Sequence, residues 1–85
     1  MNSMDKRIGF VGIIIENRKE HADAVNHVLS EFGKTIVVRT GVPNVRSKYA
    51  VITLVVDATN EEIGAFTGKL GMIEGVSVKS ALSKE

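Results

Sequence analysis

The chain has 85 residues, enough for one small domain with a modest core but too few for two domains. Eleven Lys and Arg residues against ten Asp and Glu residues give a formal net charge of +1, without the basic block typical of nucleic-acid binding. The absence of cysteine excludes disulfides, iron–sulfur clusters and Cys-type zinc sites formed by this chain alone. The apolar stretches are too short to span a bilayer and none resembles a signal peptide, so we expect a cytoplasmic protein with no membrane contact.

The first expected element is a strand at residues 6–16, after a flexible polar lead at residues 1–5, so that residues 6–85 form a single domain. This strand is apolar on both alternating faces, with Ile8, Phe10 and Ile14 on one face and Val11, Ile13 and Ile15 on the other. A domain this small covers one side of a sheet with its own helices. The second apolar face therefore predicts self-association.

A helix is predicted to begin after Asn17, which is expected to cap it, with Glu20 reaching back to the cap. Apolar residues at i, i+3, i+4 and i+7 continue to Phe32, and Gly33 is expected to end the helix in a left-handed conformation.

The second strand is predicted at residues 34–42, followed by a loop to residue 47 because Gly41, Pro43 and Asn44 break it. A third strand follows at residues 49–57. The run Thr59-Asn60-Glu61-Glu62 is a capping box, so a second helix is expected to begin there and to end near Gly71. The last strand is predicted to open at Gly75-Val76.

The order strand, helix, strand, strand, helix, strand predicts an α+β fold, the ferredoxin-like βαββαβ plait. Its four-stranded antiparallel sheet has the order 4-1-3-2, with both helices on one face. In this order the two strands that are apolar on both faces are central, so pattern and topology agree.

The predicted homo-oligomer, a dimer or tetramer, has two groups of candidate contacts. The first group lies on the central strands and consists of Phe10, Ile13, Ile52 and Leu54. The second group lies on the second helix and consists of Gly64, Gly68 and Gly71. A face-to-face dimer with sheets about 10 Å apart is favoured over edge-to-edge extension of the sheet. The three glycines share one stripe of the second helix, which indicates either close approach of a second subunit or ligand, or a short helix with tolerated glycines.

A carboxylate or phosphate site is predicted where the first helix begins and near the end of the second strand. Its candidate residues are Asn17, Arg18, Arg39, Thr40 and Gly41. The simpler alternatives are a solvated Arg18 paired with Glu16 or with an acid of its own helix, and a structural ion pair for Arg39. His21 and His27 lie about 240° apart around the helix, so no metal site is expected, nor any cofactor.

No nucleophile–base pair or pair of carboxylates suggests catalysis, so the chain is not expected to be an enzyme. Strand three lacks the asparagine that an acylphosphatase needs. RNA-recognition modules present stacking aromatics on the central strands, whereas Phe10 and Tyr49 are the strand aromatics here. Direct binding of nucleic acid is therefore not expected.

Five segments, residues 7–17, 41–43, 57–63, 67–71 and 75–81, together resemble a small bacterial family, the iron-only hydrogenase system regulators. The resemblance implies an ACT-like domain that senses a small molecule or assists assembly. The chain departs from amino-acid-binding ACT domains at Glu16-Asn17-Arg18-Lys19, and it lacks the strand histidines and the cysteine of the nickel-responsive repressor.

The function expected from this resemblance is a non-enzymatic, homo-oligomeric regulator of an iron-only hydrogenase system that binds a small anionic ligand or a partner protein. The alternative is a scaffold for hydrogenase maturation enzymes that acts through the exposed edge strands without a ligand.

Overall fold

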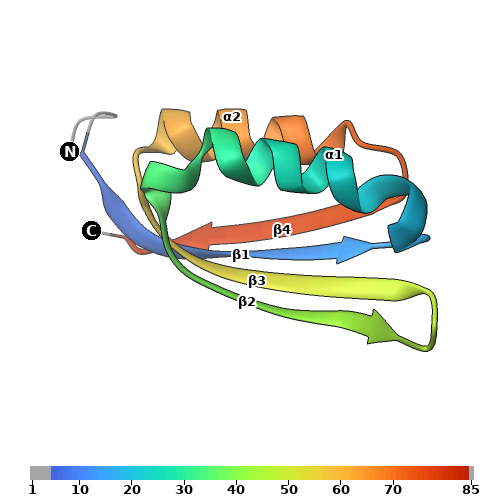
Figure 1. Ribbon diagram of the computed structural model, residues 1–85. Coiled ribbons are helices and arrows are strands. Elements are labelled where there is room, and N and C mark those ends of the chain that lie inside the picture. The colour runs from blue at the N-terminus through green and yellow to red at the C-terminus, as the bar shows by residue number, and fades with distance from the viewer. Residues whose placement is uncertain (1–4, 85) are drawn as a thin grey trace.

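The computed structural model describes residues 5–84 and contains two α-helices and one four-stranded sheet. Its elements are β1 (Arg7–Ile15), α1 (Arg18–Glu31), a short 3₁₀ helix η1 (Gly33–Thr35), β2 (Ile36–Val45), β3 (Tyr49–Ala58), α2 (Asn60–Gly71) and β4 (Val76–Leu82). The strand order β2-β3-β1-β4, with antiparallel neighbours, is the predicted order read from the other edge. Figure 1 shows both helices on one side of the sheet. Apart from Asp5, the lead predicted at residues 1–5 lies outside the described residues.

The hydrophobic core lies between the sheet and the helices. The buried residues are Val11, Ile13 and Ile15 of β1, Ala50, Ile52, Leu54, Val56 and Ala58 of β3, Val25, Val28 and Leu29 of α1, and Ile63, Phe66 and Leu70 of α2. The rings of Phe32 and Phe66 meet across the two helices with centroids 4.9 Å apart. The core therefore uses the face of β1 that carries Val11, Ile13 and Ile15, whereas the face with Ile8, Phe10 and Ile14 lies on the other side of the sheet.

This arrangement corrects part of the predicted interface. Ile13, Ile52 and Leu54 are buried beneath the helices, so they are core residues and not surface contacts. Phe10 lies on the opposite side of the sheet and is 56% exposed. Its contact with a second chain stays a prediction.

The side of the sheet away from the helices, which we call the open sheet face, is apolar along three strands. Cross-strand pairs place Phe10 beside Val55 and Ile14 beside Val51, and β2 continues these two rows with Val38 and Val42. Between the rows lie Gly12, Thr53 and Thr40. The open sheet face thus consists of two apolar rows separated by a row of small and polar residues.

The start of α1 differs from the prediction. Asn17 adopts a left-handed conformation, with φ 50° and ψ 59°, and its side chain makes no capping hydrogen bond. Backbone groups cap the first turn instead, since the Glu20 N–H donates to the Asn17 carbonyl at 2.9 Å and the Arg18 N–H to the Lys48 carbonyl at 3.4 Å. The expected Asn17 and Glu20 capping box is therefore wrong, and the β2–β3 hairpin helps to fix this helix end.

Two other local predictions fail for identifiable reasons. Gly33 has no positive φ and begins η1, so it does not end α1 in a left-handed conformation. β2 continues through Pro43 to Val45, whereas the strand was predicted to end at Val42 and to be followed by a loop. Because β2 is an edge strand, a proline is tolerated where a central strand would lose a ladder hydrogen bond.

The start of α2 agrees with the prediction. The Glu62 N–H donates to the Thr59 hydroxyl at 3.1 Å, and the Thr59 N–H donates to the Glu62 carboxylate at 2.9 Å. This confirms the capping box, which is a purely local signal.

The connection between β1 and α1 packs against the connection between α2 and β4. The Glu16 N–H donates to the Gly75 carbonyl at 2.7 Å, and the His21 Nδ1 lies 2.7 Å from the Glu16 carbonyl oxygen. Gly75 has φ +78°, a conformation that favours glycine. These contacts fix the beginning of α1 relative to β4.

Replacing Gly68 with alanine is expected to stabilise the chain by about 1 kcal/mol, because alanine is the better helix former. A Cβ atom at Gly64 or Gly68 has nothing within 4 Å, so the new methyl group meets no clash. Urea denaturation measures the gain, and sedimentation measures the assembly. Weaker self-association in Gly68→Ala would instead indicate that the glycine stripe contacts a second subunit.

Candidate functional site

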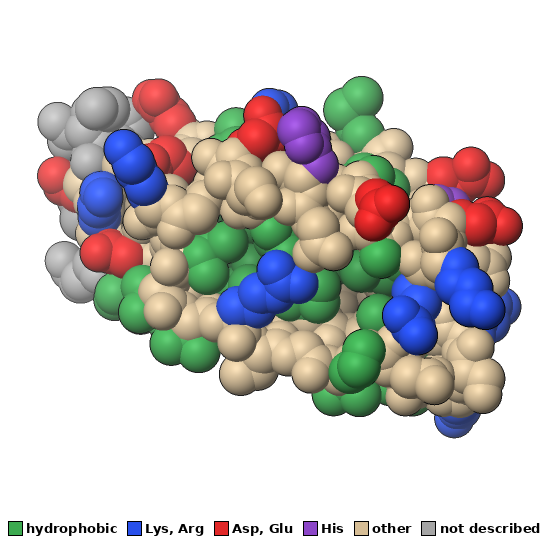
Figure 2. All heavy atoms as spheres, in the orientation of Figure 1, with side chains coloured by type: hydrophobic (Ala, Val, Ile, Leu, Met, Phe, Trp, Pro, Cys, Tyr) green, Lys and Arg blue, Asp and Glu red, His purple; other side chains and the backbone are tan. Residues whose placement is uncertain are grey.

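A groove lies between α1 and the edge strand β2. Arg18, Ala22 and Asn26 are four residues apart and share one stripe of α1, which lines the groove on one side. Gly41 and Pro43 follow Arg39 at intervals of two and line the other side. The floor is formed by Ile15, Ala50 and Ile52. Figure 2 shows the same apolar floor with basic side chains across it and at one end.

The groove stays open because its middle is built from small residues. Helix residues four apart are about 6 Å apart along the axis, and strand residues two apart are about 6.6 Å apart. Successive residues of the α1 stripe therefore lie opposite successive residues of the β2 stripe. With Asn26 opposite Arg39, this spacing sets Ala22 opposite Gly41. The hollow has a volume of about 350 Å³, at the small end for ligand pockets.

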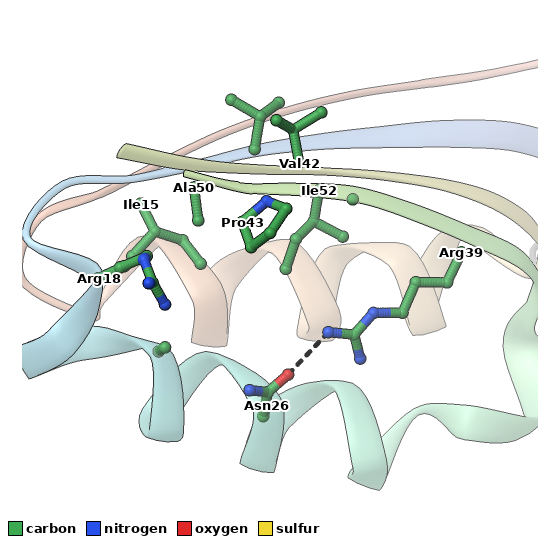
Figure 3. A pocket seen from close by; sticks show the side chains of 11 residues that line it. Ile15, Arg18, Asn26, Arg39, Val42, Pro43, Ala50 and Ile52 are labelled. Atoms are coloured by element: carbon green, nitrogen blue, oxygen red, sulfur yellow. Dashed lines mark hydrogen bonds between the residues drawn. The ribbon is translucent and has the colours of Figure 1, made fainter. Parts of the chain in front are cut away.

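The two ends of the groove carry guanidinium groups. Figure 3 shows Arg18 at one end and Arg39 at the other, both directed toward the space between sheet and helix. Arg39 donates from Nη2 to the Asn26 side-chain oxygen at 2.9 Å, which uses one of its five N–H donors. Arg18 forms no side-chain hydrogen bond within residues 5–84.

Neither arginine forms an ion pair with a carboxylate in the part of the chain that the structure describes. The expected pairing of Arg18 with Glu16 is wrong, because Glu16 instead faces Lys48, with Nζ and Oε1 3.9 Å apart. The structural ion pair expected for Arg39 is also wrong, since its partner is the neutral Asn26. Both positive charges are therefore available to an anion.

A second, more polar hollow of about 480 Å³ adjoins the groove at the start of α1. It is lined by Asn17, Arg18, Lys19, Glu20, Asn44, Ser47 and Lys48, so Arg18 borders both hollows. This second hollow has no apolar floor, and it offers an organic ligand less to bury than the groove does.

The structure brings together three of the five predicted ligand residues. Arg18, Arg39 and Gly41 line the groove, and Asn17 lines the adjoining polar hollow. Thr40 lies on the open sheet face, where it pairs with Thr53, so its side chain points away from the groove. Thr40 is therefore not a lining residue of the groove, because neighbouring strand residues alternate between the two faces.

Sequence reasoning missed the residues that complete the groove, chiefly Asn26 and Pro43. The i, i+4, i+8 stripe of Arg18, Ala22 and Asn26 was a usable signal, because it places one charged and one amide side chain on a single face of α1. The sequence does not show that this stripe lies opposite β2, because that depends on tertiary packing.

Residues 5–84 contain neither a metal-binding cluster nor a membrane-spanning helix. No group of three or more His, Asp or Glu residues there is placed to hold a metal ion. No helix in the same part of the chain is long and apolar enough to cross a membrane.

Comparison with known proteins identifies similar sequences and folds. Residues 7–80 match the TM1266-like family model, described as "Iron-only hydrogenase system regulator, putative". The structure of the uncharacterized protein TM1266 from Thermotoga maritima is 41% identical, with a TM-score of 0.87, and the match covers 94% of this chain and 100% of that one. No curated protein matches the chain.

Two more distant structures share the fold alone. The ACT domain from the GTP pyrophosphokinase of Chlorobium tepidum is 18% identical, with a TM-score of 0.74, covering 89% of this chain and 99% of that one. A nitrogen regulatory PII-like protein from Thiomonas intermedia K12, bound to ADP, AMP and bicarbonate, is 17% identical, with a TM-score of 0.53. That match covers 92% of this chain and 91% of the PII-like chain.

Proposed function

This chain belongs to the TM1266-like family of iron-only hydrogenase system regulators, and from that membership we propose that it is a non-enzymatic, self-associating regulatory domain that binds a small anionic ligand in the α1–β2 groove. The regulated target is then an iron-only hydrogenase system, as the family's description has it. Residues 5–84 form the plait and contain no helix-turn-helix, so we propose no direct DNA contact for this part of the chain.

The observation that carries the proposal is the pair of guanidinium groups, Arg18 and Arg39, at the ends of an apolar hollow. Guanidinium groups bind carboxylates and phosphates through two parallel hydrogen bonds. A ligand that fits has an anionic group for an arginine and a short apolar body for the floor formed by Ile15, Ala50 and Ile52. Asn26 holds the Arg39 side chain across the groove before a ligand arrives.

A thermal-shift screen with short aliphatic carboxylates, amino acids, nucleotides and phosphorylated metabolites tests this proposal. A ligand at about 100 times its Kd stabilises the folded chain by about 2.7 kcal/mol, which raises Tm by roughly 10–20 °C for a domain of this size. The result that contradicts ligand sensing is a flat response to the whole panel.

For a compound that binds, Arg39→Gln is expected to weaken affinity at least about tenfold, because a hydrogen bond to a charged group is lost. Gly41→Val is expected to weaken binding by filling the hollow, while its Cβ meets Val51 and Ile52 atoms at ordinary distances of 3.6 and 3.8 Å. Calorimetric titration measures both affinities.

Lys34→Gln is the matched control, since it removes one positive charge from η1 outside the groove. Equal weakening in Lys34→Gln and Arg39→Gln would indicate a general effect of net charge and would contradict binding in the groove.

Exposure of the edge strand favours a second candidate function, a scaffold for hydrogenase maturation enzymes. The residues of β2 from Val37 to Asn44 are exposed, so a partner strand has access to this edge. Pro43 has no N–H to donate, which limits strand addition to the part of β2 before it. Stable co-purification with a maturation enzyme, together with no thermal shift from any ligand, would favour the scaffold.

A further inference from the structure

We infer that the open sheet face binds a second copy of this chain face to face, with Phe10 of each copy seated in the notch above Gly12 of the other. This inference rests on the self-association within the proposed function and names the surface that mediates it. It does not depend on the ligand or on the hydrogenase system.

The first argument is the apolar character of the surface. Phe10 and Ile8 are each 56% exposed, and Ile14, Val38, Val42 and Val55 on the same face are exposed as well. The cross-strand pairs make Phe10, Val55 and Val38 neighbours in one row and Ile14, Val51 and Val42 neighbours in the other, with the row of Gly12, Thr53 and Thr40 between them. Exposed apolar side chains gathered on one face of a domain are typical of interaction sites.

The second argument is shape. Phe10, Gly12 and Ile14 follow one another on the same side of β1, so the strand presents a large side chain, a gap and another large side chain. A Cβ atom built at Gly12 meets only the Lys79 carbonyl oxygen, at 4.0 Å. This gap is the notch above Gly12, and it is flanked by Thr53 of β3 and Lys79 of β4. One strand therefore carries both a protruding aromatic ring and a space that admits one.

The proximity of these two features favours a second copy over an unrelated partner. A twofold interface is self-complementary, so a residue that contacts position 12 of its partner receives the same contact in return. With the two β1 strands antiparallel and facing each other, Phe10 over Gly12 places Gly12 over Phe10. An unrelated protein has to supply both a matching ring and a matching notch.

Charge and size agree with this arrangement. The charged residues that we place on this face are Asp57, opposite Ile8, and Lys79, opposite Gly12, so two copies of the face do not repel each other through net charge. From strand geometry, the face from Ile8 to Ile14 across four strands measures about 20 Å by 15 Å, a footprint of roughly 300 Å² per copy. Stable complexes bury about 800 Å² per partner, so we expect a dimer that dissociates at micromolar concentrations.

The test is sedimentation or light scattering of the full chain from about 1 µM to 1 mM, with variants that exchange the ring and the notch. Phe10→Gly removes the ring, and Gly12→Phe fills the notch. Each single variant is expected to weaken the dimer at least tenfold, because a central aromatic anchor is lost or blocked. The double variant Phe10→Gly/Gly12→Phe restores one ring and one notch, and it is expected to recover the dimer.

Met72→Ala serves as the control, since Met72 is an exposed apolar residue beyond the end of α2, away from the open sheet face. Far-ultraviolet circular dichroism of every variant confirms that the fold is retained. A wild-type chain that stays monomeric at 1 mM overturns self-association itself. A wild-type dimer that both single variants leave unchanged overturns this interface, and failure of the double variant to recover overturns the pairing of Phe10 with Gly12.

Discussion

Gly9→Ala is expected to destabilise the fold by about 3 kcal/mol, the upper range for overpacking a well-packed site. A Cβ atom at Gly9 meets the Ala81 carbonyl oxygen and lies 2.5 Å from Leu82 Cδ2 and 3.1 Å from Leu82 Cα. The oxygen and the Cα belong to the backbone of β4, which pairs with β1 at this point, so the strands must move apart. A loss of this size lowers Tm by roughly 12–24 °C in a domain of this length.

Gly41→Ala is the matched control for Gly9→Ala, because it adds the same methyl group to a strand glycine. Its Cβ meets its nearest neighbours at 3.6 and 3.8 Å, so the expected change is within about 1 kcal/mol. Urea denaturation at one protein concentration measures both variants, since the proposed self-association would make stability depend on concentration. Similar losses in the two variants would contradict close contact of β4 with Gly9.

Gly75→Ala is expected to cost about 3 kcal/mol, from two sources. At φ +78° an L-residue is strained by roughly 1–2 kcal/mol. The new Cβ also lies 2.7 Å from the His21 ring and 3.3 Å from the Glu16 carbonyl oxygen. The ring can move, but it then loses its contact with the Glu16 carbonyl, which ties α1 to the end of β1.

A double-mutant cycle separates these two sources. His21→Ala alone is expected to cost about 1 kcal/mol for the lost hydrogen bond. In the His21→Ala background, Gly75→Ala meets no ring, so its cost is expected to fall to that of the backbone strain. Additive losses from the two substitutions would show that the ring does not oppose the new methyl group.

The topology and the core of this chain are predictable from its sequence because the patterns that encode them are local and repeated. Alternation along β1 indicates two apolar faces, and the order of the elements predicts which strands are central. Alternation does not say which face the helices cover. That ambiguity explains why Ile13, Ile52 and Leu54 were candidates for an interface although they lie in the core.

Predictions that depended on contacts between distant segments succeeded less well. The Thr59 capping box involves residues three apart and was predicted correctly. The prediction that Asn17 caps α1 was wrong. The Arg18 N–H at this helix end donates to the carbonyl of Lys48, which lies in the distant β2–β3 hairpin. The groove could not be predicted for the same reason, because Ala22 and Gly41 form a hollow only when α1 lies beside β2.

Proline in the outer strand of the sheet has a further consequence, for behaviour at high concentration. A sheet edge with a complete set of backbone donors can recruit strand after strand and grow without limit into fibrils. Pro43 interrupts that set of donors on β2. Growth through the edge is thereby discouraged. The proposed pairing through the open sheet face, by contrast, ends at two copies, so it would form a closed dimer and would not lead to aggregation.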